Sequence, residues 1–233
     1  MPRQLAIIGT GRMGQAVAAL APEMGWNVGV ALDARSNANG QGITRETLRG
    51  ADVAIEFTEA EAAPANIRAC LAAGCPVVVG TTGWYSELPA IRADVERSGG
   101  SLLWAPNFAV GVNVFAEIVR YAGTLLANVE GFDAHITETH HTAKKDAPSG
   151  TASLLRDNLG ATLGRVVPVT SVRTGSVPGT HEIMLDAPFE QIVLRHEARD
   201  RRVFAAGALT AAHWLIGRRG AFTMSDMLGA SAP

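Results

Sequence analysis

The sequence opens with an apolar stretch that runs directly into a glycine-rich loop, and this feature restricts the fold more than any other. Residues 4–9 read Q-L-A-I-I-G, which is typical of a short buried strand, and the loop leads into a helix predicted over residues 15–24. Strand, G-x-G-x-x-G and helix in this order predict a dinucleotide-binding unit. Gly9 allows the sharp turn, Gly11 lets a pyrophosphate approach the backbone, and Gly14 permits close packing of helix and strand.

The first half of the chain continues as an alternation of strands and helices, which predicts an α/β unit with a parallel, doubly wound, Rossmann-like sheet. We expect strands over residues 26–32, 52–58, 76–79 and 101–104, with helices over 61–73, 86–98 and 112–127. Ligands bind such sheets at the carboxyl ends of the strands. Asp33, about twenty residues after the glycine loop, is therefore placed to accept hydrogen bonds from the adenosine ribose of a dinucleotide.

Beyond residue 128 the pattern changes, because strand-like stretches outnumber helices. They lie around residues 130–140, 166–173, 181–186 and 190–197, with one long helix over 151–163. This predicts a second, α+β domain built on an open mixed sheet. We predict a dinucleotide-binding domain over residues 1–107, completed by the C-terminal helical segment 207–233, and a second domain over 108–206.

Titratable side chains are unusually dense in residues 138–151, E-T-H-H-T-A-K-K-D-A-P-S-G-T. Either His140 or His141 can exchange a proton near neutral pH. Lys144 and Lys145 bring positive charge that suits a carboxylate. The segment therefore predicts acid-assisted chemistry on a small molecule that carries carboxylates.

The same segment ends in a turn that leads into a predicted helix. Ser149 or Thr151 is a natural N-cap, and the unpaired N–H groups of a helix start form an anion site. This site lies next to the lysines in the sequence, so both features favour an anionic ligand.

Composition excludes several classes of partner. The net charge of −2 gives no bulk attraction to nucleic acid or to an anionic membrane. Cys70 and Cys75 have no metal-ligand spacing and indicate a reducing compartment. No signal peptide is evident and no apolar run approaches the ~20 residues of a membrane span. We expect a cytoplasmic protein without a metal.

The pattern H-H-x-x-K-x-D-A-P-S-G-T at residues 140–151 resembles the signature of the 4-hydroxy-tetrahydrodipicolinate reductase family, also called dihydrodipicolinate reductase. That family serves lysine and diaminopimelate biosynthesis. Other segments are similar to the family across nearly the whole chain: E-F-T at 56–58, where the family has D-F-T, G-T-T-G at 80–83, A-P-N-F-A-V-G-V-N at 105–113, and R-T-G-S-V-P-G-T-H-E at 173–182. The glycine loop is one residue shorter than in many members.

The resemblance implies reduction of a cyclic unsaturated imine dicarboxylate to tetrahydrodipicolinate by NAD(H) or NADP(H). Because Asp33 should repel a 2′-phosphate that Arg35 and Arg12 could attract, we expect use of both cofactors with a modest lean to NADH. It implies a homotetramer formed through the second-domain sheets. His140 matches the proton donor of the family and Lys144 its catalytic lysine, whereas Lys145 falls at a variable position. The implied substrate-binding residues are His141, Ser149, Gly150, Thr151 and Thr82. The implied cofactor-binding residues are Gly9, Thr10, Gly11, Arg12, Met13, Asp33, Phe57, Gly80, Thr81, Thr82, Ala105, Pro106, Asn107 and Phe108.

Two other functions share part of this pattern. A different two-domain dehydrogenase, acting on an amino acid or a sugar, would share the first domain by fold alone. A non-catalytic NAD(H)-binding regulator would need neither the histidines nor the lysine of residues 138–151.

Overall fold

The computed structural model describes residues 2–229, and the chain divides into two compact units. The first unit joins the described residues up to Val110 with those from Arg202 onward, and the second spans Gly111–Arg201. The C-terminal part of the chain therefore returns to the unit that contains the glycine loop.

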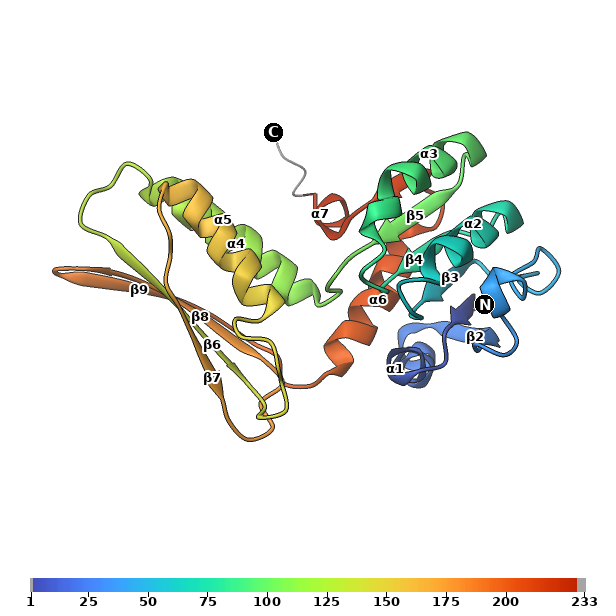
Figure 1. The fold of residues 1–233 in the computed structure, drawn as a ribbon, viewed down its shortest axis with the longest axis horizontal. Coiled ribbons are helices and arrows are strands. Elements are labelled where there is room, and N and C mark those ends of the chain that lie inside the picture. The colour runs from blue at the N-terminus through green and yellow to red at the C-terminus, as the bar shows by residue number, and fades with distance from the viewer. Residues whose placement is uncertain (1, 230–233) are drawn as a thin grey trace. The chain divides into compact units, whose positions relative to one another are not determined.

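The first unit is built on a six-stranded parallel sheet (Figure 1). Its strand order is β10-β5-β4-β3-β1-β2. The strands are β1 (Arg3–Ile8), β2 (Trp26–Leu32), β3 (Val53–Glu56), β4 (Val77–Val79), β5 (Ser101–Trp104) and β10 (Gly220–Phe222). The chain leaves β1 towards β2 on one side and returns to β3 on the other, so the strand order reverses beside β1.

Helices cover both faces of this sheet, because its strands are apolar on both sides. Leu5 and Ile7 of β1 face a core that includes residues of α1 (Arg12–Leu20) and α6 (Arg202–Leu215). Ala6 and Ile8 face a second core with α2 (Ala63–Ala73) and α3 (Leu88–Ser98). Alternate residues of one strand therefore supply two cores, as expected for a parallel sheet buried on both faces.

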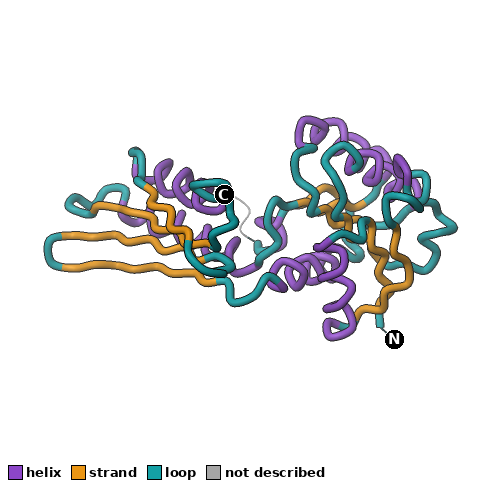
Figure 2. Tube along the Cα trace, turned by 60° about the horizontal axis from the view of Figure 1, so that its bottom comes forward, coloured by secondary structure: helices purple, strands orange, loops and turns teal. Residues whose placement is uncertain are grey.

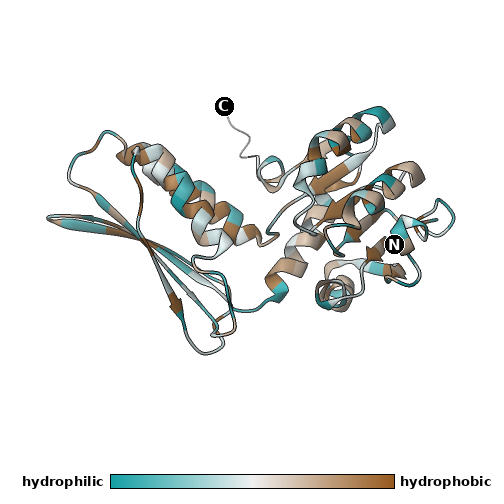
Figure 3. Cartoon of the chain, viewed as in Figure 1, coloured by the Kyte–Doolittle hydropathy of each residue, from teal (hydrophilic) through white to brown (hydrophobic). Residues whose placement is uncertain are grey.

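The second unit is a four-stranded mixed sheet with one face covered by two helices, α4 (Val110–Leu126) and α5 (Gly150–Leu163) (Figure 2). Its strands lie in the order β7-β6-β8-β9. They are β6 (Asp133–His140), β7 (Val169–Arg173), β8 (Thr180–Ala187) and β9 (Glu190–Glu197). β6 pairs parallel with β7 and antiparallel with β8. The other face is open, and hydrophilic and hydrophobic residues are mixed along these strands in Figure 3.

The predicted fold class is confirmed: a Rossmann-like sheet and a second domain on an open mixed sheet. Three local expectations were wrong. Helix α6 begins at Arg202, not at residue 207. The first helix begins at Arg12, and a 3₁₀ turn over Ala21–Met24 replaces its expected end. β10 was not expected, because three residues are too short to show strand periodicity, yet it extends the sheet beside β5.

Gly207 in α6 tests how closely this helix packs in the first unit. A methyl group there would overlap the backbone carbonyl of Phe108, which follows β5. Gly207→Ala gains about 1 kcal/mol of helix propensity but incurs an overpacking cost of roughly 1–3 kcal/mol. We expect a net loss, seen as a Tm lower by roughly 2–8 °C in thermal unfolding. Thr210→Ala, on the exposed side of α6, is the control; a Gly207→Ala protein as stable as that control would contradict the packing.

Candidate active site

A cavity of about 720 Å³ lies at the carboxyl ends of β1, β2 and β3 in the first unit. Its wall brings together five of the predicted cofactor residues, namely Gly9, Thr10, Gly11, Asp33 and Phe57. The cavity lies where the strand order reverses, the usual ligand crevice of an open α/β sheet.

The glycine loop has the shape that a dinucleotide pyrophosphate requires. Gly9 has φ +95, and a Cβ there would overlap the carbonyl of Phe57. A Cβ at Gly14 would overlap the carbonyl of Gly9, whereas one at Gly11 meets nothing within 4 Å. The open side of the loop is therefore at Gly11, where α1 begins without a side-chain cap and without an acidic residue in its first turn. Such a helix start suits a phosphate. Arg12 is exposed beside it, whereas Met13 packs partly against the core of the unit.

Asp33 follows β2 and organises its own turn. Its Oδ1 accepts hydrogen bonds from the Arg35 and Ser36 backbone N–H groups at 3.0 and 2.8 Å, and from the Ser36 hydroxyl at 2.8 Å. These bonds, those of Ser36 above all, lower the pKa of Asp33. The carboxylate is therefore ionised, exposed to solvent and fixed at the cavity wall.

The predicted cofactor residues that follow β4 and β5 do not line this cavity, although Gly80 packs against Phe57 of its wall. A Cβ at Gly80 would overlap the Phe57 ring. Thr81 is buried, and its hydroxyl accepts a hydrogen bond from the Thr58 N–H at 2.7 Å, while Thr82 is exposed. The Thr81 side chain therefore supports the loop, and the next residue faces solvent.

After β5, Ala105 and Phe108 are buried in the core next to Phe57. The Phe108 and Phe57 rings meet edge to face at 6.2 Å. Asn107 closes the turn by accepting from the Ala109 N–H at 2.8 Å, and Pro106 is exposed. These side chains shape the loop, so any contact with a cofactor would come from its backbone or from Pro106.

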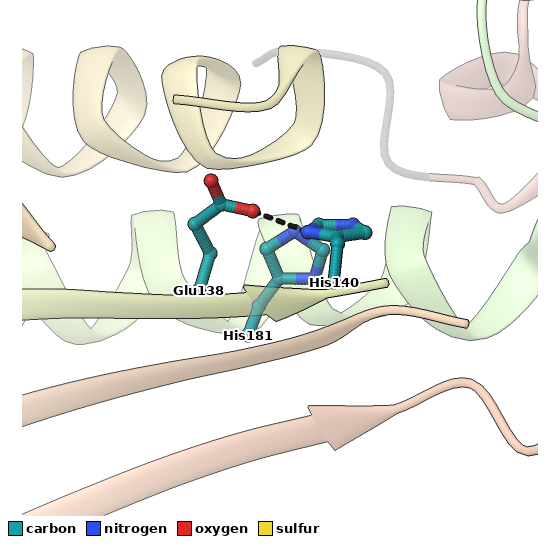
Figure 4. Close-up of side chains that lie close together, drawn as sticks. All are labelled: Glu138, His140 and His181. Carbon is teal, nitrogen blue, oxygen red and sulfur yellow. Dashed lines mark ion pairs between the residues drawn. The ribbon is translucent and has the colours of Figure 1, made fainter. Parts of the chain in front are cut away.

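The second unit contains a cluster of buried titratable residues, Glu138, His140 and His181 (Figure 4). Glu138 and His140 continue the series of every second residue of β6 that begins with the core residues Ala134 and Ile136, so all four lie on the same face. His181 lies opposite Glu138 on β8. All therefore point to the face covered by α4 and α5. Glu138 Oε2 contacts His140 Nδ1, and the two imidazole rings lie edge to face with centroids 5.3 Å apart.

Burial sets the ionisation of this cluster. Burial lowers the pKa of His140, and Lys144 and Arg173 act in the same direction, while Glu138 opposes them. Burial, followed by the neighbouring His140, lowers the pKa of His181 to about 4. His181 is thus a neutral imidazole near pH 7, and burial favours the neutral form of His140 as well.

The other predicted residues of this segment lie on the loop after β6. The Lys144 ammonium pairs with Asp146 at 2.8 Å. His141 is half-buried, and its Nε2 lies 2.9 Å from an Arg201 guanidinium nitrogen. Lys145 is exposed. Asp146 is exposed and Lys144 is half-buried, and an ion pair near the surface contributes only about 0–1 kcal/mol, so a ligand carboxylate can replace Asp146 at the lysine.

The turn that follows begins α5, with Ser149 as the N-cap. Its hydroxyl accepts from the Ala152 N–H at 3.1 Å and lies 3.3 Å from His181 Nε2. Gly150 and Thr151 form the first turn, which carries no acidic residue. A Cβ at Gly150 would meet nothing within 4 Å, so this helix start has space for an anion.

The three clustered side chains offer ligand atoms within 4.8 Å of one another, which also raises the question of a metal. Arg173 already donates to Glu138 Oε1 at 2.7 Å, and the Lys144 charge acts on His140. Two cations beside the cluster oppose a divalent ion and favour an anionic ligand. The absence of a metal stays a prediction.

Sequence reasoning missed Glu138, Arg173 and His181. The spacing of Ala134, Ile136 and Glu138 by two residues was the available signal, since it puts this carboxylate on the buried face. Arg173 and His181 reach the site by pairing of β6 with β7 and β8, which no local pattern shows.

A Rossmann-type sheet with a cavity shaped for a dinucleotide, joined in sequence to a second unit with a buried imidazole, defines a two-domain nucleotide-dependent oxidoreductase. Family models described as dihydrodipicolinate reductase, N-terminus, and dihydrodipicolinate reductase, C-terminus, match residues 3–108 and 111–228. The chain belongs to the dihydrodipicolinate reductase family, whose members use NAD(P)H.

Individual relatives agree with this assignment. The chain is 33% identical over 238 residues to a 4-hydroxy-tetrahydrodipicolinate reductase of Christiangramia forsetii, covering 96% of this chain and 97% of that protein. A dipicolinate-bound dihydrodipicolinate reductase from Paenisporosarcina sp. TG-14 has a TM-score of 0.83 at 20% identity, covering 98% of this chain and 100% of the other. A putative myo-inositol dehydrogenase from Sinorhizobium meliloti has a TM-score of 0.55 at 13% identity over 99% of this chain and 90% of its own, a likeness of fold alone.

The low pKa of His181 makes stability depend on pH. The unfolded chain takes up a proton near pH 6.5, but the folded chain does so only near pH 4. Above pH 6.5 this histidine is neutral in both states and does not lower the free energy of unfolding. As the pH falls from 6.5 towards 4, it lowers the free energy of unfolding by an increasing amount. The full difference is about 3 kcal/mol at most. We expect His181→Gln to lose less stability than the native chain between pH 7 and 4.5, measured by urea unfolding.

His135→Gln is the control, because it removes a histidine from the opposite face of the same sheet. An equal loss of stability on acidification in all three proteins would contradict the neutral, buried state of His181.

Proposed function

We propose that this chain reduces the 4-hydroxy-tetrahydrodipicolinate (dihydrodipicolinate) ring to tetrahydrodipicolinate with NAD(P)H, in lysine and diaminopimelate biosynthesis. The observation that carries the proposal is the buried His140 in contact with Glu138, on the strand that leads to Lys144 and the open start of α5. A relative with bound dipicolinate supports a cyclic dicarboxylate as the ligand of this chain.

The residues of the second unit suit the two needs of such a substrate. Lys144 and the first turn of α5, with Gly150 and Thr151, provide positive charge and backbone N–H groups for ring carboxylates. His141 and Ser149 flank this site. Thr82 is the one substrate-binding residue that we assign to the first unit. We assign the catalytic roles to His140 and Lys144.

The 4-hydroxy compound loses water to give the dihydrodipicolinate ring, and reduction of that ring requires one hydride and one proton. The reduced nicotinamide supplies the hydride when it is bound. His140 supplies the proton to the ring carbon adjacent to the one that accepts the hydride. A positioned acid contributes typically ~10²–10⁴-fold to such a step. Burial and the nearby cations Lys144 and Arg173 lower the pKa of His140. A lower pKa makes the imidazolium a stronger acid, which suits a proton donor.

The first unit binds the dinucleotide in this proposal, with the pyrophosphate at Gly9, Thr10 and Gly11 and the adenosine ribose at Asp33. Backbone groups of the segments after β4 and β5, residues 80–82 and 105–108, follow along the same edge of the sheet. The fit of the glycine loop and its cavity supports this placement.

We also propose a cytoplasmic homotetramer assembled through the second unit. Its sheet is covered by helices on one face, and the open face carries the exposed apolar residues Val172, Met184 and Val193. Such residues on an open sheet favour contact with another copy. Within the described residues, no helix has the length and apolarity to cross a membrane.

The catalytic roles are tested by His140→Gln and Lys144→Ala, with Lys145→Ala as the matched control. We expect the first two to lower kcat by about 10²–10⁴-fold, because the proton donor or the carboxylate partner is lost. NADH affinity, measured by fluorescence titration, should stay close to native, since neither residue belongs to the nucleotide unit. Turnover is followed as NAD(P)H oxidation with the freshly made condensation product of pyruvate and aspartate semialdehyde. Native turnover in His140→Gln and Lys144→Ala would contradict the assignment.

Cofactor preference follows from the charges around the ribose. The ionised Asp33 favours ribose hydroxyls and repels a 2′-phosphate, whereas Arg35 and Arg12 can attract that phosphate. Exposed arginines are screened at physiological salt, where the Debye length is about 8 Å. We expect both cofactors to be used, with kcat/KM for NADH higher by less than about tenfold. Asp33→Ser should shift the ratio towards NADPH, and Arg45→Ala is a charge control. A native preference for NADPH of about tenfold or more would show that the arginines dominate.

A further inference from the structure

Glu138 is fully buried and contacts three different parts of the second unit. Its Oε1 accepts hydrogen bonds from the Arg173 guanidinium on β7 at 2.7 Å and from the Ser149 N–H at 3.2 Å. Its Oε2 contacts His140 Nδ1 on its own strand. One carboxylate therefore joins the histidine, the neighbouring strand and the residue that caps α5.

The contact with Nδ1 selects between the two nitrogens of the His140 ring. A carboxylate is an acceptor, so Nδ1 keeps its hydrogen and Nε2 becomes the atom that gains or releases a proton. Nε2 lies next to Gly179, where a Cβ would approach it to 3.0 Å. The glycine thus leaves space on the side of the ring from which a proton departs.

The other oxygen of Glu138 holds the loop that carries Lys144. Arg173 Nη2 bridges from Glu138 Oε1 to the Asp146 carbonyl, to which it donates at 2.6 Å. Asp146 in turn pairs with the Lys144 ammonium. Together with the bond to the Ser149 N–H, this fixes both ends of the turn between the lysine and α5.

The charge of Glu138 survives burial. Burial by itself raises the pKa of this carboxyl, but hydrogen bonds from Arg173 and Ser171, with His140 nearby, lower it to about 2. The side chain is thus a carboxylate at every pH at which the enzyme would be assayed.

We propose that Glu138 is a positioning residue that fixes the tautomer of His140 and holds the turn bearing Lys144 and the α5 start in place. The proposal rests on the proposed function. The imidazolium holds one hydrogen on Nδ1, facing Glu138, and one on Nε2. The Nε2–H bond breaks as the new C–H bond forms on the ring. The imidazole that remains is neutral and protonated at Nδ1, and Glu138 takes no proton.

The pH profile distinguishes this role from a purely structural one. Groups from each neighbouring element face His140: Glu138 on β6, Lys144 on the loop, Arg173 on β7 and His181 on β8. A donor must be protonated, so kcat/KM falls as the pH rises through the pKa of His140, which is lowered from 6.5. Glu138 favours the imidazolium. Its loss therefore moves this descending limb to lower pH.

The experiment compares Glu138→Gln, Glu138→Asp and the control Glu182→Gln, which alters a half-buried carboxylate on the outer face of the same sheet. For Glu138→Gln we expect kcat lower by about 10²–10⁴-fold, because the amide no longer enforces one tautomer. The descending limb of kcat/KM should move to lower pH. The dissociation constants of NADH and of pyridine-2,6-dicarboxylate should change by less than about tenfold, far less than kcat. Glu138→Asp restores the charge and should recover turnover above that of the Gln variant.

Native kcat and an unmoved limb in Glu138→Gln, with turnover lost in His140→Gln, would overturn the positioning role and leave the proposed function intact. Native turnover in His140→Gln would overturn both. If Glu138→Gln does not fold, the tautomer of His140 in the native protein decides, measured by nitrogen-15 NMR: a neutral ring protonated at Nδ1 supports the proposal, and a ring protonated at Nε2 refutes it.

Discussion

The second unit depends on a buried charge that is neutralised within the sheet. Taking a carboxylate out of water costs several kcal/mol unless charged and polar partners replace the solvent. Glu138 meets this condition with Arg173, the Ser149 N–H and His140. Those partners come from two strands and from the turn before α5, so the same contacts that make the charge tolerable also bring the candidate catalytic residues together.

In the first unit the candidate site is shaped by the backbone rather than by buried charge. Gly9, Gly14 and Gly80 stand where a side chain would overlap a carbonyl or the Phe57 ring. The loops after β1, β3 and β4 can therefore lie against one another, which leaves the cavity beside Gly11 and Asp33. The side chains of Thr81 and Asn107 hold their own loops by hydrogen bonds. Nucleotide binding in this account rests mostly on backbone N–H groups.

Sequence patterns predicted much of the fold because they are local. The run from Leu5 to Ile8 and the glycine loop predicted the nucleotide unit. The dense segment 138–151 left open which histidine and which lysine matter, and the family resemblance chose His140 and Lys144. β10 escaped detection because three residues carry too little periodicity. Glu138 stands two residues after Ile136, a spacing that indicates the buried face of the strand. An acidic residue in a strand is ordinarily exposed, however, so this spacing alone did not identify it. Arg173 and His181 belong to the site only through strand register, which depends on tertiary structure. Ser149 rather than Thr151 proved to be the N-cap, a choice that the sequence left open.

The tautomer of His140 is the most direct test of the account, because every step assigned to this residue depends on which nitrogen keeps its hydrogen. Nitrogen-15 NMR of the histidine rings, with the His140 signals assigned by their loss in His140→Gln, reports this for the unliganded enzyme above the pKa of His140. The contact between Glu138 and Nδ1 predicts a neutral ring protonated at Nδ1. A ring protonated at Nε2, with Nδ1 bare beside the carboxylate, would contradict the account.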